Sequence, residues 1–198
     1  MTSRSPRRSH PVDPHGDQLT FAVSGLLAEL PGTVREYAVD GVEVDPGDGL
    51  VVTEPVSGTV RLARTNRGLV LDARFQTGLA GECARCTRPL VIPITLRIDE
   101  EVLPTIDLAS GMAVPLEEGA DPEAPRLTDH HELELRPLVL EAISLQEPIA
   151  PVCDPDCPGL CTECGERLEI GHPTHDSPID PRLEALRAFR VDADDETG

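Results

Sequence analysis

The stretch GLVLDARFQTGLAGECARCTRPLVIPITLRIDEEVLP, residues 68–104, decides the fold. Its first half places Leu69, Leu71, Ala73 and Phe75 at every second position, which is the spacing of a β-strand with one buried face. A second apolar run at 90–103 follows, and Cys83-Ala-Arg-Cys86 separates the two runs. The stretch therefore predicts a β-hairpin whose tip carries two thiols.

The segment before this hairpin extends it into an antiparallel meander. Residues 57–65, SGTVRLART, alternate apolar and basic side chains, and residues 66–68, NRG, form a turn signal that leads into the hairpin. We therefore expect three antiparallel strands between residues 50 and 103.

Helices are predicted on both sides of the meander. Residues 135–148, LRPLVLEAISLQEP, favour a helix with Pro137 at its first position and Pro148 beyond its end. A short helical or extended piece is expected at 26–30, and a further helix at 180–190 with Asp180 as its N-cap. The apolar stripe of the 135–148 helix is Leu138, Val139, Ala142, Ile143 and Leu145. The expected fold class is α+β: an antiparallel β meander or partly closed sheet, two or three helices, and zinc-knuckle loops.

One domain with two appendages is the expected organisation. Residues 1–18 are rich in Arg, Ser, Pro and His, and indicate a disordered basic arm. Residues 19–190 form the single domain, which contains an acidic, mobile loop at about 104–132 and a Cys-rich segment at 153–175. Residues 191–198 are an acidic, solvated tail.

The charge is strongly negative and unevenly distributed. The formal net charge is −19, and residues 11–198 carry 14 arginines against 36 acids, a charge of −22. Such a body repels phosphate and suits a basic partner protein better than non-specific binding to duplexes. No run of 18 apolar residues and no signal-peptide core is present, so we expect no membrane association and a cytoplasmic location.

The cysteines indicate a metal site. In the cytoplasm thiols stay reduced, which argues against disulfides. The segment Cys161-Thr-Glu-Cys164-Gly165 has the form of a zinc knuckle, because thiolates at i and i+3 converge on one ion and the glycine permits the tight turn. Cys83 and Cys86 have the same spacing without the glycine. We therefore expect one or two structural zinc ions.

Two ligand partitions remain open. A long-range partition uses Cys83, Cys86, Cys153 and Cys157 for one ion, while a second ion is bound by Cys161, Cys164, His172 and His175. A local partition uses Cys153, Cys157, Cys161 and Cys164 alone and closes less chain, which lowers its entropy cost. The first accounts for every thiol and the second for the shortest loop.

Sequence motifs of common catalytic sites are absent. The sequence contains no zinc-deaminase pair of motifs, no H-E-x-x-H, no G-x-x-x-x-G-K-[ST], no G-x-S-x-G and no G-x-G-x-x-G. If every zinc ligand is a side chain, no coordination position is left for water, and the metal is structural. We therefore predict no catalytic residue, and no small-molecule substrate is evident.

An ordered set of motifs resembles the YceD family, the large ribosomal RNA subunit accumulation proteins. The set comprises Pro31-Gly32 with Arg35, GECARC at 81–86, LRPLVLEAISLQEPIAPVC at 135–153, DCPGLCTECGERL at 156–168 and IDPRLEAL at 179–186. The arginine-only, His-bearing segment GHPTHDSPIDPR resembles the actinobacterial branch. The resemblance implies a cytoplasmic protein needed for normal accumulation of 23S rRNA, and hence for assembly of the large ribosomal subunit.

Two hypotheses about activity follow. The first is a non-enzymatic assembly factor that binds the large-subunit precursor, either through rRNA at Arg85 and Arg88 or through a basic ribosomal protein at its acids. The second is a thiol oxidoreductase or RNA-processing enzyme that uses the two Cys-x-x-Cys pairs. An aromatic stacking platform for bases is missing from the sequence, which disfavours recognition of single-stranded RNA.

Overall fold

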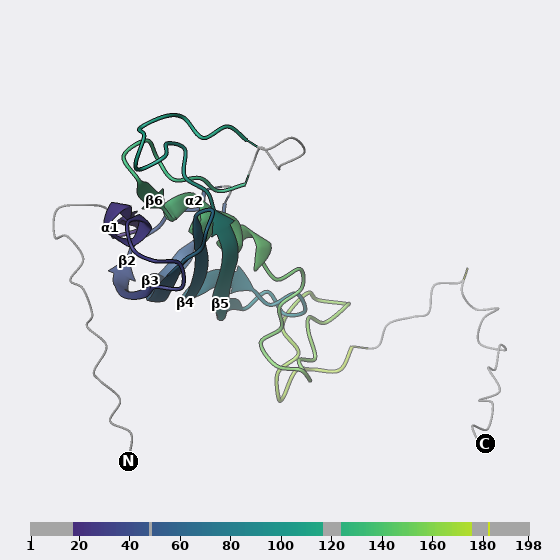
Figure 1. The fold of residues 1–198 in the computed structure, drawn as a ribbon. Coiled ribbons are helices and arrows are strands. Elements are labelled where there is room, and N and C mark those ends of the chain that lie inside the picture. The colour runs from purple at the N-terminus through teal and green to yellow at the C-terminus, as the bar shows by residue number, and fades with distance from the viewer. Residues whose placement is uncertain (1–17, 48, 117–123, 176–181, 183–198) are drawn as a thin grey trace, which may run out of the picture.

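A computed structural model describes residues 18–47, 49–116, 124–175 and 182. These residues contain two helices and six strands (Figure 1). Four of the strands form an open sheet, and the other two strands pair in a smaller layer on one of its faces. The elements in chain order are β1 (Thr20–Ala22), α1 (Ser24–Leu27), β2 (Val34–Val42), β3 (Val52–Arg64), β4 (Leu69–Glu82), β5 (Pro89–Val102), β6 (Glu132–Glu134) and α2 (Arg136–Leu145).

The main sheet is antiparallel and has the order β2-β3-β4-β5. The hairpin at 68–104 is confirmed, with Leu69 opposite Val102 at one end and Glu82 opposite Pro89 at the other. The partial closure that we expected is not confirmed, because β2 and β5 are the two edges of an open sheet. Strand β2 was not anticipated, although Tyr37 and Val39 follow the two-residue period of a strand.

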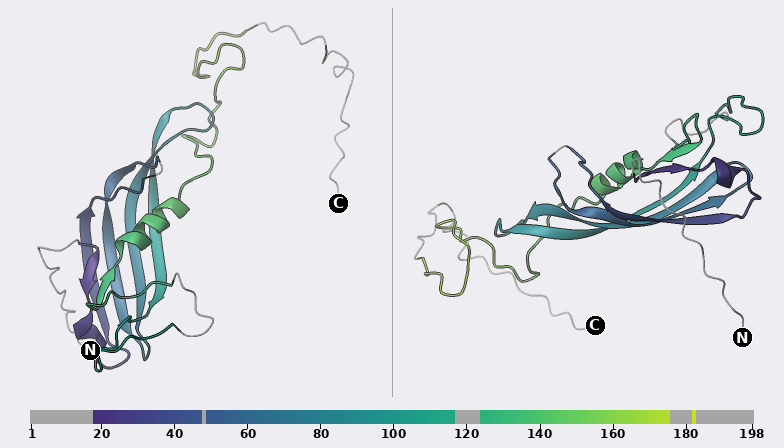
Figure 2. Two further views of the ribbon diagram at one scale, coloured as in Figure 1. Left: turned by 90° about the horizontal axis from the view of Figure 1, so that it is seen from above. Right: turned by 90° about the vertical axis from the view of Figure 1, so that its left-hand side faces the viewer.

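A second layer covers one face of the sheet. Strand β1 pairs with β6 in a separate two-stranded sheet, and α2 follows β6 directly. Figure 2 shows this pair and α2 on the same face, and no described helix or strand lies over the opposite face. The core lies between the layers and contains Phe75, Leu71 and Leu96 from the sheet with Val139 and Ile143 from α2.

Helix α2 confirms the helix predicted at 135–148, including a proline in its first turn. One detail of its apolar stripe is wrong: Leu145, the last residue of the helix, is 76% exposed. Leu138 and Ala142 are only partly buried against the core. The helix predicted at 180–190 lies outside the described residues, apart from Arg182, and so do most of the expected arm and the acidic tail.

The described parts of the acidic loop at 104–132 form local bridges. Leu103 pairs with Arg126, and Ile106 pairs with Ala113. The hydroxyl of Thr105 also donates a hydrogen bond to the carbonyl of Leu127. These parts are therefore bound to the end of β5, and only residues 117–123 of the loop lie outside the description.

Candidate metal centres at the end of the sheet

The β4–β5 hairpin tip and the Cys-rich segment meet at one end of the sheet (Figure 1). Strands β4 and β5 pair as far as Glu82 and Pro89, so Cys83 and Cys86 stand in the turn that joins them. The chain that follows α2 returns to this turn, where the N–H of Ala84 donates to the carbonyl of Pro151 at 2.7 Å. The fold thus brings residues about 70 positions apart into contact.

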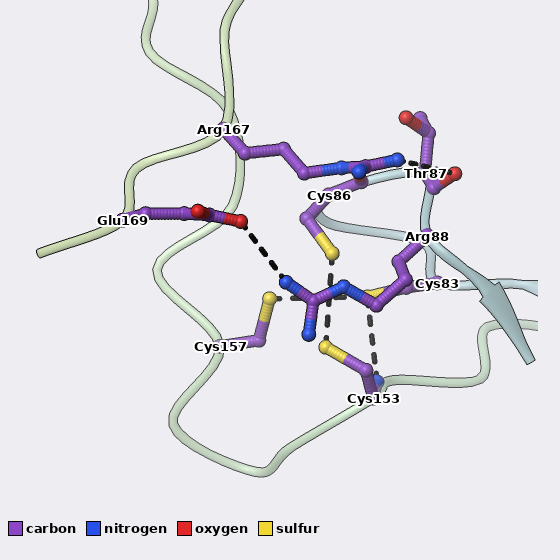
Figure 3. Close-up of polar contacts among 8 residues, drawn as sticks. All are labelled: Cys83, Cys86, Thr87, Arg88, Cys153, Cys157, Arg167 and Glu169. Atoms are coloured by element: carbon purple, nitrogen blue, oxygen red, sulfur yellow. Dashed lines mark hydrogen bonds and ion pairs between the residues drawn. The ribbon is translucent and has the colours of Figure 1, made fainter. Parts of the chain in front are cut away.

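Four thiols form the first centre (Figure 3). The Sγ atoms of Cys83 and Cys157 are 3.8 Å apart, and those of Cys86 and Cys153 are 3.6 Å apart. All four sulfurs lie within 4.8 Å of one another. Four thiolates around a tetrahedral zinc ion, at Zn–S distances of about 2.3 Å, have sulfurs about 3.8 Å apart. The Cys83–Cys157 and Cys86–Cys153 distances match this spacing, and the four sulfurs are close enough together to hold one metal ion.

Two thiols and two imidazoles form the second centre. The ligand atoms of Cys161, Cys164, His172 and His175 also lie within 4.8 Å of one another. The Sγ of Cys164 is 3.3 Å from Nε2 of His172, against about 3.5 Å for a sulfur and a nitrogen on one tetrahedral zinc ion. Cys161 is buried, whereas Cys164 and His175 are exposed. The second centre is therefore more open to solvent than the first.

The two Cys-x-x-Cys turns share one backbone pattern. In the first, the N–H of Thr87 donates to the carbonyl of Cys83 at 2.9 Å; in the second, Gly165 donates to Cys161 at 2.9 Å. Both Thr87 (φ 54°) and Gly165 (φ 74°) are left-handed. The sequence predicted the second knuckle from its glycine, and the structure shows that the first adopts the same turn with a threonine in the strained position.

Backbone N–H groups surround the first thiol of each turn. Hydrogen bonds from the backbone, above all from the N–H of Cys153 at 3.4 Å, lower the pKa of Cys83 to about 6. Backbone N–H groups of Cys164 and Glu163 lower the pKa of Cys161 in the same way. Stabilised thiolates of this kind are what a metal ligand needs, since the metal binds the deprotonated sulfur.

Two other thiols of the first centre, those of Cys153 and Cys157, have raised pKa values and stay neutral. The pKa of Cys153 is raised to about 12, chiefly by its hydrogen bond with Cys157 and then by burial. Burial also raises the pKa of Cys157. Four crowded sulfurs cannot all ionise side by side, and a divalent cation among them would supply the missing positive charge.

Arginine side chains tie the pieces of the site together. Arg167, from the second knuckle, donates to the carbonyls of Cys86 at 2.8 Å and Thr87 at 3.3 Å (Figure 3). Arg85, from the first knuckle, donates to the carbonyls of Pro155 at 2.9 Å and Cys157 at 3.1 Å. Arg167 therefore links the second knuckle to the first, and Arg85 holds the Cys157 loop of the first centre on the hairpin turn. Sequence reasoning missed this role of Arg167, which no spacing rule marks.

In the structure, the predicted ligand atoms group as in the long-range partition and not as in the local one. Cys83 and Cys86 group with Cys153 and Cys157, and the described residues contain no cluster that joins Cys153 and Cys157 to Cys161 and Cys164. Of the two arginines predicted to contact a partner, Arg85 is used internally, and Arg88 forms a 3.1 Å ion pair with Glu169. Both side chains remain at the surface.

The fold and the site define a class of protein: a four-stranded open antiparallel sheet, covered on one face by a smaller layer, whose end carries two knuckle-type clusters of Cys and His ligands. The family model described as Large ribosomal RNA subunit accumulation protein YceD matches residues 71–190. The chain belongs to this family, as its motifs indicated. Among the described residues, no helix has the length and apolar character needed to cross a bilayer.

The curated relatives are mycobacterial. Proteins of Mycobacterium tuberculosis and Mycobacterium bovis, both described as uncharacterized, are 32% identical over 167 residues, which is 82% of this chain and 73% of theirs. An uncharacterized protein of Mycobacterium leprae is 30% identical over 162 residues, 79% of this chain and 68% of its own. These relatives agree with an actinobacterial-type member. No solved structure matches the chain.

Proposed function

We propose that this chain is a non-enzymatic cytoplasmic factor that supports 23S rRNA accumulation and large-subunit assembly, and that it holds two structural zinc ions. Membership of a family named for accumulation of the large ribosomal RNA supports the first part. The second part is supported by two groups of four ligand atoms, each with a spacing that suits a tetrahedral zinc ion.

A single observation carries the non-catalytic assignment. Each cluster supplies four side-chain ligands, so a tetrahedral ion in either cluster has no position left for water or substrate. The zinc ions would instead hold the Cys-rich segment on the hairpin tip. This matters because the described segment at 150–175 contains no helix or regular strand of its own.

The partner in this proposal is the precursor of the large ribosomal subunit. Two routes to it are open to an acidic chain: a locally basic surface that reaches rRNA, or acids that bind a basic ribosomal protein. The zinc-braced end of the sheet gives either surface a rigid support, because Arg85 and Arg167 fix its loops to the hairpin.

Metal analysis combined with substitution tests the zinc sites. Elemental analysis of protein prepared without chelator should return about two zinc ions per chain, and Cys83→Ser and Cys161→Ser should each remove about one. Protein without zinc would contradict the proposal. Loss of all metal from Cys161→Ser, with none lost from Cys83→Ser, would instead support a local four-cysteine site.

Depletion of the protein in its host tests the cellular role. The expected result is a lower ratio of 23S to 16S rRNA and an accumulation of large-subunit precursors in sucrose gradients, with wild-type protein sedimenting with these particles. The matched control is complementation by the Arg61→Gln variant, whose ion pair with Glu36 is long at 4.0 Å and lies away from the metal centres. Unchanged rRNA ratios and a protein found only at the top of the gradient would refute the role.

A further inference from the structure

The open face of the sheet carries a hollow of about 500 Å³ over β3, β4 and β5. We propose that this hollow binds a backbone phosphate of the large-subunit rRNA; the inference rests on the proposed function and names its contact surface. Figure 2 shows that the face lies opposite α2 and the β1–β6 pair. The side chains that line the hollow are Ser57, Thr59, Arg74, Gln76, Thr95 and Arg97.

Two arginines stand directly opposite each other in the hollow. Arg74 on β4 pairs in register with Arg97 on β5, and like charges in this arrangement destabilise a sheet. Arg74 has one acidic partner, Asp72, at 3.4 Å. Arg97 forms no ion pair or hydrogen bond through its side chain with any described residue. An anion between the two guanidinium groups would therefore remove a repulsion that the fold leaves in place.

The rest of the lining adds donors and no acid. Thr59 lies opposite Arg74, while Gln76 lies opposite both Ser57 and Thr95, so hydroxyl and amide groups flank the arginine pair. The hydroxyl oxygen of Ser57 accepts a hydrogen bond from the N–H of Gly41 at 3.0 Å, which leaves its own hydrogen available. Arginine forks with hydroxyl and amide donors are the groups that proteins use on nucleic-acid phosphates.

The side chains that line the hollow favour binding of a phosphate over binding of a base or a peptide. The only aromatic residue at the hollow, Phe75, is fully buried on the other face, so no ring is offered for stacking and no apolar side chain anchors a peptide. The next row along the strands carries Asp72 opposite Asp99. These acids restrict the basic strip to the arginine row, which suits one phosphate or two neighbouring ones.

Salt-dependent binding to protein-free 23S rRNA tests the inference with the full-length chain. In filter binding between 50 and 200 mM KCl, each lost phosphate contact should reduce the slope of log affinity against log salt by about 0.7–0.9. Arg97→Gln should therefore weaken binding about five- to eightfold at 0.1 M salt, and Arg74→Gln in combination should weaken it further. Arg97→Lys should retain most of the slope, because the charge remains.

The matched control is Arg61→Gln, which removes an arginine from the same face outside the hollow. It should leave the slope unchanged, and all variants should keep the metal content and circular dichroism of the wild type. Equal effects of Arg61→Gln and Arg97→Gln would overturn the inference in favour of diffuse attraction, and so would no effect of either hollow arginine. Wild-type protein that sediments with precursor particles yet does not bind protein-free 23S rRNA would also overturn it, while leaving the proposed function intact.

Discussion

Replacing Thr87 with glycine should strengthen the first metal centre. Thr87 follows Cys86 with φ 54°, and a left-handed conformation costs a non-glycine residue about 1–2 kcal/mol. Glycine removes that cost but has more freedom to lose on folding, a penalty of about 0.5–1 kcal/mol. The net gain is therefore about 0.5–1 kcal/mol, which corresponds to roughly a two- to fivefold tighter hold on zinc. The hydrogen bond that Arg167 donates to the backbone carbonyl of residue 87 should persist, because glycine has the same carbonyl.

The equivalent position in the second knuckle supplies the reciprocal change. Gly165 has φ 74°, and a Cβ added there would meet no atom within 4 Å. Gly165→Ala therefore adds backbone strain without a steric clash and should weaken the second centre by about 1 kcal/mol, or roughly fivefold. Ala84→Gly is the control in the first turn: Ala84 has no left-handed conformation, so glycine there should bring only its entropy cost.

The assay is competition for zinc with a chromophoric chelator, in which zinc is released from the two centres in two successive phases. Thr87→Gly should shift only the phase of the first centre towards tighter binding, and Gly165→Ala should shift only that of the second towards weaker binding. A weaker first centre in Thr87→Gly, matching the effect of Ala84→Gly, would refute the reasoning. It would mean that the turn does not impose the left-handed conformation on residue 87.

Two further predictions follow from the sheet and from the Cys-rich segment. Gly58→Ala should lower the free energy of unfolding in urea by about 3 kcal/mol or more, because the new Cβ would lie 2.0 Å from the carbonyl oxygen of Arg74 on β4. The control is Gly25→Ala, where the atom nearest to the new Cβ belongs to a flexible side chain at 3.4 Å, and it should change the free energy of unfolding by less than about 0.5 kcal/mol. Equal effects of the two substitutions would contradict the argument. Removal of zinc by a chelator should increase hydrogen exchange in residues 150–175 first and leave β3, β4 and β5 protected; equal exchange in that segment with and without zinc would contradict a structural role for the metal.

Local periodicity was sufficient to predict the hairpin and α2. Alternation at Leu69, Leu71 and Phe75 identifies a strand with one buried face, and every one of these residues is buried. Strand β2 was missed because its alternation is weaker: only Val39 and Val42 are fully buried, and Gly41 interrupts the run beside a shift in register with β3. An edge strand has one neighbour and therefore a less demanding burial pattern.

The grouping of the thiols depends on tertiary structure. Chain entropy favours a local Cys153–Cys164 site, and the two partitions use overlapping ligands, so spacing alone left them open. The structure separates them because the long strands β4 and β5 carry Cys83 and Cys86 to the end of the sheet, where the chain after α2 arrives. The hollow at Arg74 and Arg97 was equally hidden from the sequence, since strand register decides which arginines face each other.

The internal bonds of Arg85 change how arginine substitutions at the hairpin must be interpreted. Its guanidinium donates to the carbonyls of Pro155 and Cys157, so Arg85→Glu would place a carboxylate against two carbonyl oxygens and loosen the loop that carries the Cys157 thiol. Loss of ribosome binding in that variant would therefore not identify an RNA contact unless the metal content were unchanged.

Arg88 has only an exposed ion pair with Glu169, worth about 0–1 kcal/mol. Arg88→Glu therefore distinguishes a direct contact with rRNA from a structural role in the knuckle better than Arg85→Glu does, because the side chain of Arg88 does not hold the knuckle in place. If Arg88→Glu and Arg97→Gln both weaken rRNA binding while zinc is retained, the binding surface runs from the hollow to the hairpin tip. If only Arg97→Gln does so, the metal centres serve to hold the Cys-rich segment, and the contact with rRNA lies on the open face of the sheet.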